Sequence, residues 1–209
     1  MSANHAAFNL IFRFVENYVS PIAGRISSQR HVMAIRDGFI SAMPFMIVGS
    51  FLLVFAYPPF SPDTTWGFAR AWLDMAKQFE GQILTPFDMT MGVMSLYICA
   101  AIAYNLGKHY VKTHQLDPFM CAMLSLMAFL LVAAPKTKGA LPVDSLGGTG
   151  IFTAILVAIY CVEMMRFLKA HNIGIRLPDQ VPPMIKNSFD LLIPVLVVVL
   201  TLYPLSLLI

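Results

Sequence analysis

The chain has 209 residues, of which 58% are hydrophobic and 12% are charged, and its mean hydropathy is +0.72. Ordinary soluble domains are about 45–50% apolar and about 25% charged, so this composition excludes a soluble enzyme, a disordered chain and a disulfide-rich secreted scaffold. The formal net charge of +3 is too small to indicate a nucleic-acid partner. The sequence therefore predicts an integral membrane protein.

The first 38 residues are predicted to form a cytoplasmic amphipathic segment. Apolar residues recur there at helical spacing, while Arg13, Glu16 and Arg25 fall on other faces. A helix of this kind lies in the plane of the membrane interface, and we expect Pro21 to bend it. No long apolar run begins within the segment, so we expect no cleavable signal peptide.

Five long apolar stretches follow, each long enough to cross a bilayer. A helix rises about 1.5 Å per residue, so a hydrocarbon layer of about 30 Å needs roughly 17–25 residues. Lipid offers no partner to an open backbone, so each crossing segment is expected to be a helix. The predicted fold is all-α, with an N-terminal interfacial helix and five transmembrane helices at about 39–57, 89–106, 118–134, 147–168 and 191–209.

The distribution of Lys and Arg predicts the side of the membrane on which the chain begins. Loops rich in these residues stay in the cytoplasm. With a cytoplasmic N-terminus, the inner segments carry ten of the Lys and Arg residues and the outer loops carry four. The first outer loop, 58–88, holds Trp66, Phe68, Trp72 and Phe79, which suits an interfacial helix on the outer face.

Motifs that carry chemistry are nearly absent. Cys99, Cys121 and Cys161 are widely spaced within apolar runs and are predicted to be buried small hydrophobic residues. Polar groups deep inside the uncharged apolar runs are neutral, namely Ser50, Thr90, Ser95, Asn105 and Ser125, whereas ion-coupled carriers usually bury an ionisable residue at that depth. An ion-coupled carrier is therefore disfavoured, no catalytic residue is evident, and we predict no metal and no cofactor.

Three polar features have structural interpretations that we prefer. The glycine-rich stretch 147–150 lacks the lysine of a phosphate-binding loop and is expected to form a turn with close helix packing. His109 and His114, in a predicted short loop, are expected to be solvated rather than metal ligands. Glu163 and Arg166 are three residues apart on a helix, so they are predicted to pair near the interface.

Three further stretches have functional potential. In the first, Arg30 and Arg36 lie at the cytoplasmic boundary, and Gly38 and Ala42 offer a small-residue face for close helix approach. The third is a long cytoplasmic loop that prolines stiffen, and it holds Asp179. The stretches are Gln29–Ile40 with Met43-Pro44 and Ile47-Val48-Gly49-Ser50, then Met91–Leu96, then Ile175–Pro183 with Asn187-Ser188-Phe189 and Leu192-Ile193-Pro194.

In this order, the three stretches resemble the sugar-transporting membrane subunit, enzyme IIC, of bacterial phosphoenolpyruvate-dependent phosphotransferase systems, in the lactose/cellobiose branch. The resemblance covers about residues 15–205, and its most specific parts read QRHVMAIRDGFI…MP and LPDQVPP…NSF…LIP. It implies that residues 39–209 form the N-terminal membrane half of a longer permease. In that family this half builds the dimer interface. The family's Gly-Ile-His-Gly and Asn-Glu-Pro stretches, in the half that holds most of the sugar site, have no counterpart here.

The resemblance also implies a function, a location and partners. We expect a membrane component of a permease for a β-linked disaccharide such as cellobiose, in the bacterial inner membrane and as a homodimer. A separate IIB subunit, served by IIA, would phosphorylate the translocated sugar. Asp179, Asn187 and Ser188 are candidate substrate contacts, and Arg30 and Arg36 are candidates for the IIB docking surface. Alternatively, Asp179 and Asn187 only brace their loop.

A second hypothesis is a truncated, non-transporting membrane remnant or a small interaction protein. The last apolar run reaches Ile209 without a polar or aromatic flank, which favours a fragment of a longer permease over a short outer end. The sugar itself stays open among cellobiose, chitobiose, lactose and aryl-β-glucosides, because the discriminating contacts are expected in the other half.

Overall fold

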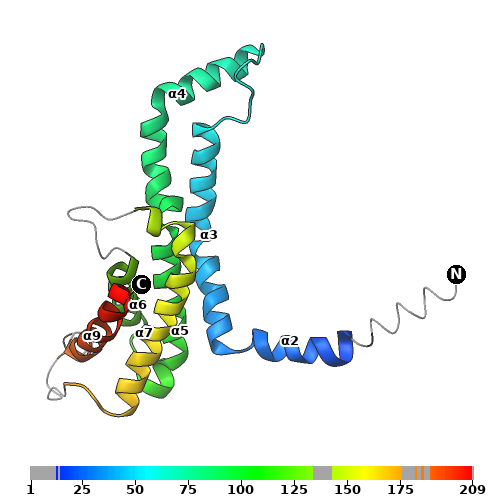
Figure 1. Cartoon of the computed structure of the whole chain (residues 1–209). Coiled ribbons are helices and arrows are strands. Elements are labelled where there is room, and N and C mark those ends of the chain that lie inside the picture. Colours follow the sequence, from blue (N-terminus) through cyan, green and yellow to red (C-terminus); the bar gives the residue numbers. More distant parts are fainter. Residues whose placement is uncertain are drawn as a thin grey trace.

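The structure, a computed structural model, describes residues 13, 15–133, 143–175, 182, 185 and 189–208, and every regular element in these ranges is helical. The predicted all-α class is confirmed. A hairpin of two helices rises from a bundle, and a short helical arm leaves the base of the bundle sideways (Figure 1).

The longest described single helix is α3 (Arg30–Ala56). The side-chain oxygen of Gln29 caps it by accepting a hydrogen bond from the Val32 N–H at 3.1 Å, which satisfies one free donor of the first turn. Its 27 residues span about 40 Å, more than a hydrocarbon layer. The helix begins at Arg30, inside the predicted amphipathic segment, so it is longer than the first predicted span at about 39–57.

The arm consists of η1 (Val15–Val19) and α2 (Ser20–Ser27). The chain changes from π-helical to α-helical geometry directly before Pro21, where the sequence predicts a bend. No residue of α2 is buried, and Ile22 and Ile26 are largely exposed. A helix that lies in the membrane interface needs apolar side chains that are free to enter the bilayer, and α2 has them. Its contact with a membrane stays a prediction.

The chain returns along α3 through α4 (Gly67–Phe87), η2 (Asp88–Gly92) and α5 (Met94–His114) (Figure 1). Phe79 has φ −112° and ψ 15°, so α4 kinks there. The part of α4 before the kink lies across the tip of the hairpin, and the part after it runs beside α3 (Figure 1). The predicted outer helix thus accounts for only the first part of α4.

The short loop predicted at 107–117 is wrong, because α5 continues to His114. His109 is exposed on that helix and His114 is partly buried, its ring contacting Tyr110. The helix α5 already packs on α3 and α7, so further hydrogen-bonded turns can be added to it beyond the end of the apolar run. Polar residues at an exposed helix end do not by themselves terminate it.

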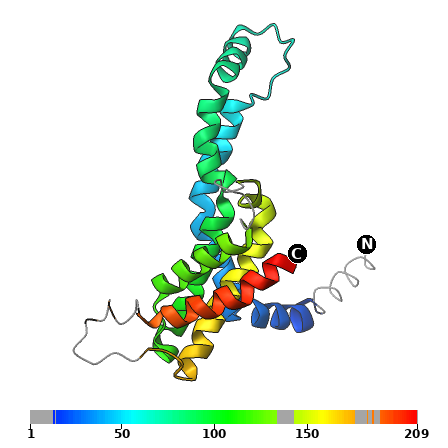
Figure 2. The same ribbon diagram turned by 60° about the vertical axis from the view of Figure 1, so that its left-hand side comes forward.

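The bundle is completed by α6 (Pro118–Ala133), α7 (Ile151–Ala170) and α9 (Leu192–Leu208), with η3 (Val143–Ser145) and η4 (Gly148–Gly150) leading into α7. The central helix is α5, which packs on α3, α6 and α7. Figure 2 shows α9 crossing the bundle obliquely, where it contacts α6 and α7.

The core of the bundle is formed by small and branched side chains. Cys99, Cys121 and Cys161 come from α5, α6 and α7, and all three are buried free thiols, as predicted. Gly38 packs so closely on α5 that a Cβ atom there would lie 2.9 Å from the Ile102 nitrogen. Ala42 is buried on the same face, so this small-residue face is used within the chain rather than between copies.

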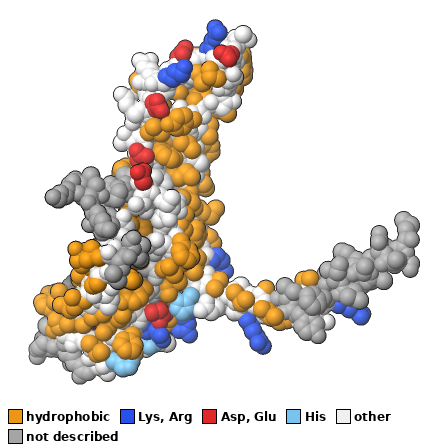
Figure 3. All heavy atoms as spheres, viewed as in Figure 1, with side chains coloured by type: hydrophobic (Ala, Val, Ile, Leu, Met, Phe, Trp, Pro, Cys, Tyr) orange, Lys and Arg blue, Asp and Glu red, His pale blue; other side chains and the backbone are white. Residues whose placement is uncertain are grey.

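Three segments are long and apolar enough to cross a membrane: Arg30–Ala56, Gly67–His114 and Gly148–Ala170. The apolar helices α6 and α9 are shorter, so the count of five spans stays a prediction. Figure 3 shows hydrophobic side chains along the length of the molecule, with charged groups at the tip of the hairpin and at the base and further acidic groups along one edge of the shaft between them. A long apolar surface is what a chain that crosses a bilayer requires.

Candidate functional site

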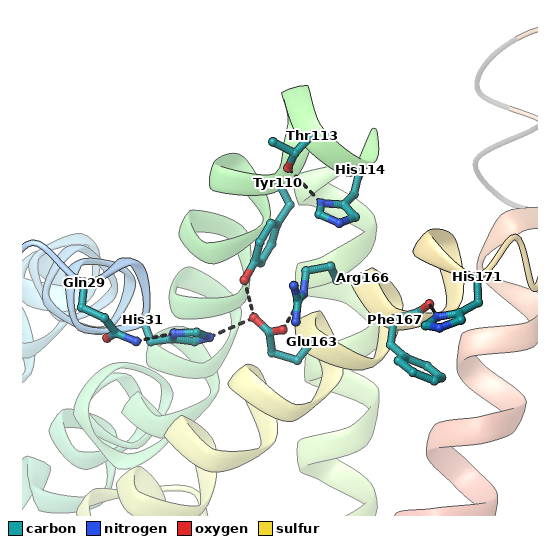
Figure 4. Close-up of polar contacts among 9 residues, drawn as sticks. All are labelled: Gln29, His31, Tyr110, Thr113, His114, Glu163, Arg166, Phe167 and His171. Carbon is teal, nitrogen blue, oxygen red and sulfur yellow. Dashed lines mark hydrogen bonds and ion pairs between the residues drawn. The ribbon is translucent and has the colours of Figure 1, made fainter.

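A hydrogen-bonded cluster joins three helices at the base of the bundle (Figure 4). The carboxylate of Glu163 on α7 accepts hydrogen bonds from His31 of α3 at 2.9 Å and from the Tyr110 hydroxyl of α5 at 2.5 Å, both on Oε1. Arg166 donates its Nε–H to Oε2 at 2.6 Å. The predicted Glu163–Arg166 pair is therefore present, as one part of a network that fastens α3 and α5 to α7.

The cap of α3 also sets the proton position on His31. The Gln29 oxygen accepts from the Val32 N–H, so the Gln29 amide nitrogen faces Nδ1 of His31, 2.7 Å away. An amide nitrogen donates only, which makes Nδ1 the acceptor and leaves the proton of a neutral His31 on Nε2, aimed at Glu163. The helix cap and the three-helix cluster are thus coupled through one imidazole ring.

The two arginines predicted for partner docking have different surroundings. Arg30 begins α3, and its guanidinium carbon lies 5.3 Å from the centroid of the Tyr110 ring, beside the cluster. Arg36 is exposed and forms an ion pair with its neighbour Asp37 at 2.8 Å. The structure therefore brings Arg30 to the cluster and leaves Arg36 on the outer surface of the same helix.

The predicted substrate contacts Asp179, Asn187 and Ser188 lie outside the described residues. An ion pair joins the two ends of their loop. Lys169, near the end of α7, places its ammonium nitrogen 2.8 Å from a carboxylate oxygen of Asp190, just before α9. Both side chains are about two-thirds buried. This contact fixes the two ends of the predicted substrate loop relative to each other.

A second candidate site is a cavity of about 750 Å³ between α6, α7 and α9. Its walls are mainly apolar, and its polar groups are hydroxyls, among them those of Thr153, Tyr160 and Ser206. The Tyr160 hydroxyl forms a 2.7 Å hydrogen bond with Thr201 of α9. The described lining residues include no carboxylate and no imidazole, so they are suited to a neutral ligand or a packed helix and offer no acid–base chemistry.

The glycine-rich turn before α7 has the packing role predicted for it. Ser95, at the start of α5, donates its hydroxyl to the Gly147 carbonyl and its backbone N–H to the Leu146 carbonyl. A Cβ atom on Gly150 would lie 2.9 Å from the Ser95 hydroxyl and 3.2 Å from the Phe129 ring. These contacts require glycine for close approach, and the turn is docked on α5.

Sequence reasoning missed His31 and Tyr110 as members of the cluster. They lie 132 and 53 residues from Glu163, and a single sequence carries no signal for pairing at that separation. The available hint was that Glu163 sits in an apolar run, where a carboxylate needs more partners than one arginine. Among the described residues, no group of three or more His, Cys, Asp or Glu is placed to hold a metal ion.

Comparison with protein families finds that residues 36–209 match the family described as Phosphotransferase system, EIIC. The cellobiose-specific EIIC component of Geobacillus stearothermophilus is 37% identical over 206 residues, which cover 90% of this chain and 43% of that protein. The lichenan permease IIC component of Bacillus subtilis is 34% identical over 203 residues, which cover 89% and 42%.

A solved structure is similar over nearly the whole chain. It is the crystal structure of the transporter ChbC, the IIC component from the N,N'-diacetylchitobiose-specific phosphotransferase system. The TM-score is 0.78 at 33% identity, and the match covers 94% of this chain and 46% of that one. The chain therefore spans less than half the length of these relatives.

Proposed function

Because this chain belongs to the EIIC family of the phosphotransferase system, we propose that it forms the N-terminal membrane half of a permease for a β-linked disaccharide such as cellobiose. The observation that carries this proposal is the family match across residues 36–209. The sugar would be phosphorylated on the cytoplasmic side by a separate IIB subunit, which IIA serves.

The names of the relatives support the substrate class. They include proteins specific for cellobiose, lactose and an oligo-beta-mannoside, and the solved neighbour is specific for N,N'-diacetylchitobiose. Some relatives are named EIICB components, a name that combines the IIC and IIB designations. These names support a IIB partner for this chain.

We place the base of the bundle, with the arm and the Glu163 cluster, on the cytoplasmic side of a bacterial inner membrane. The start of α3 and the ends of α5 and α7 meet there (Figure 1). If the N-terminus is cytoplasmic and the spans alternate in direction, these three helix ends lie on the cytoplasmic side. Lys and Arg side chains gather at this end, which supports the same orientation.

Asp179, Asn187 and Ser188 remain our candidates for substrate contact, on the loop whose ends Lys169 and Asp190 join. Arg30 and Arg36 are our candidates for contact with IIB. Their position on the first turns of α3, at the base of the bundle, supports this assignment. The proposal places sugar exit and partner docking on the same side of the membrane.

We also propose a homodimer that uses the outward face of α3. Large apolar side chains are exposed along it, with Phe51 64% exposed and Ile40, Val48 and Phe55 each at least half exposed. The small-residue face with Gly38 is already occupied by α5, so the dimer contact would be made by these larger side chains. In a membrane such a face packs either on lipid or on protein.

The function is tested by uptake of radiolabelled cellobiose into a bacterium that lacks its own permease but has IIA and IIB. The chain is expressed alone and together with the C-terminal half of the Geobacillus stearothermophilus relative. We expect labelled sugar phosphate to accumulate only when both halves are present. The relative's own two halves, expressed separately, show whether a split permease works at all.

The same assay decides between the two hypotheses and tests the loop residues. If the control pair transports and this chain inserts in the membrane but supports no uptake, the proposal is wrong and a non-transporting remnant is favoured. In the working pair, Asp179→Asn and Asn187→Ala are expected to reduce uptake with little change in membrane insertion. Unchanged uptake and phosphorylation would remove both residues from the substrate site.

A further inference from the structure

Three positively charged or protonatable side chains surround one tyrosine at the base of the bundle. The guanidinium carbons of Arg30 and Arg166 each lie 5.3 Å from the centroid of the Tyr110 ring, and the His114 ring lies 5.5 Å away, edge to face. Tyr110 is only 1% exposed. Its ring is therefore a buried surface over which two cationic groups from different helices are held.

The carboxylates nearby do not balance these charges. Glu163 already accepts hydrogen bonds from Tyr110, His31 and Arg166. Among the residues that the structure describes, no carboxylate lies within ion-pair distance of Arg30. Glu163 thus pairs with only one of the two permanently charged guanidinium groups, and the positive charge of Arg30 is left to attract an anion.

Arginine is suited to a phosphate in particular. Its planar fork donates two parallel N–H bonds to phosphate oxygens, and a guanidinium stacked on an aromatic ring is already oriented for this contact. Arg166 donates only its Nε–H to Glu163 and is 40% exposed. Its terminal N–H groups and the exposed guanidinium of Arg30 both lie around the Tyr110 ring, and both have the chemistry that a phosphate requires.

The surroundings of the site favour a lipid over a soluble anion. Phe167, the next residue after Arg166, is 53% exposed and packs on His171, so exposed apolar surface lies on an adjacent face of α7. The arm helix α2 leaves from the same level, with exposed Ile22, Ile26 and Arg25 (Figure 1). Apolar and basic side chains meet in this way at the boundary of a bilayer, where basic pockets between helices bind anionic headgroups.

We propose that Arg30 and Arg166 bind the phosphate of an anionic phospholipid headgroup between the ends of α3, α5 and α7. The acyl chains would lie against exposed apolar residues such as Phe167. This inference needs only that the helices span a membrane, so it stands or falls separately from sugar transport.

The test is native mass spectrometry of the full chain in mild detergent, titrated with phosphatidylglycerol or phosphatidylcholine. We expect phosphatidylglycerol to bind more tightly, and Arg30→Gln to weaken it about fivefold, which corresponds to about 1 kcal/mol per arginine at an anionic surface. Arg36→Gln is the matched control, since Arg36 lies on the same helix, pairs with Asp37 and should leave binding unchanged. Arg30→Lys keeps the charge but loses the planar fork, so it should retain binding between that of the original chain and that of Arg30→Gln.

Several outcomes would overturn the proposal. Equal binding of the two lipids, or an equal loss with Arg36→Gln, would show only general surface charge. Binding of inorganic phosphate as tightly as phosphatidylglycerol would assign the site to a soluble anion. If Arg30→Gln abolished binding of purified IIB and left lipid binding intact, the site would be a protein contact. Arg166→Gln also breaks the Glu163 pair, so the Arg30 variants decide the result.

Discussion

The two ends of the helical shaft are stabilised by different kinds of contact. At the base, one carboxylate gathers hydrogen bonds from three side chains on α3, α5 and α7. At the tip, aromatic rings pack around Phe60, whose ring centroid lies 5.9 Å from Trp66 and 5.7 Å from Trp72. The base therefore depends on charged hydrogen bonds and the tip on apolar packing, so the stability of variants at the two ends should respond differently to salt and to lipid.

The charges divide in the same way. On the side of the molecule that holds the tip and the start of α7, the described residues include more carboxylates than basic groups. At the base, basic groups outnumber carboxylates (Figure 3). An excess of Lys and Arg marks the cytoplasmic side of membrane proteins. This division supports the proposed orientation. The carboxylates of the tip side are Asp63, Asp74, Glu80, Asp88 and Asp144, and its basic residues are Arg70 and Lys77.

The largest effect is expected for Glu163→Ala at the base. The substitution leaves His31, Tyr110 and Arg166 without their shared acceptor, and the Glu163 side chain is only 25% exposed. Hydrogen bonds to charged groups contribute about 1.5–3 kcal/mol, so we expect a loss of about 2–3 kcal/mol. For a chain of this size the unfolding midpoint should fall by about 5–10 °C.

The buried thiols Cys99, Cys121 and Cys161 allow this loss to be measured with a thiol-reactive dye during heating in detergent. Asp63→Asn, which removes an exposed carboxylate at the tip, is the control and should change the midpoint little. An equal drop for both variants would show that general charge, rather than the cluster, stabilises the base.

The next effect is expected where α3 and α5 touch. Gly38→Ala places a Cβ atom 2.9 Å from the Ile102 backbone nitrogen, so the two helices must move apart. Overpacking of this kind costs about 1–3 kcal/mol. Gly81→Ala is a control of opposite sign, because nothing lies within 4 Å of its Cβ position and alanine stabilises a helix interior by about 0.5–1 kcal/mol. Stabilisation by both variants would contradict the close contact.

At the tip, Trp72→Phe should cost about 1 kcal/mol. Its indole N–H donates to the Phe55 carbonyl at the end of α3 at 3.2 Å, and phenylalanine keeps the ring packing but loses this bond. Trp66→Phe is the control, because Trp66 is 61% exposed. A loss of stability as large for Trp66→Phe would contradict the assigned role of the Trp72 hydrogen bond.

The chain has two Trp residues, both at the tip of the hairpin. Quenching of their fluorescence by brominated lipids therefore measures the depth of the tip in a bilayer.

How far the sequence predicts this molecule depends on the range of the interactions. Apolar runs and local spacing predict the helices, the buried cysteines and the Glu163–Arg166 pair, because each of these depends on nearby residues. The extension of α5 through His114 and the contacts of His31 and Tyr110 were not predicted. They depend on packing between helices that are distant in the chain, and one sequence does not specify which faces meet.

The smallest effect is expected for Lys169→Gln, which removes the ion pair with Asp190. Partly exposed pairs contribute about 0.2–1 kcal/mol, so global stability should hardly change. The local effect should be visible as faster hydrogen exchange in the first turn of α9, because Asp190 directly precedes the Leu191 carbonyl to which Val195 donates. Salt screens partly exposed charges, so the difference from the original chain should shrink at high ionic strength. Lys108→Gln, whose ammonium lies over the Tyr104 ring of α5, is the control at the same end of the molecule and should leave α9 unchanged. If both variants speed exchange equally, the Lys169–Asp190 pair does not hold the start of α9.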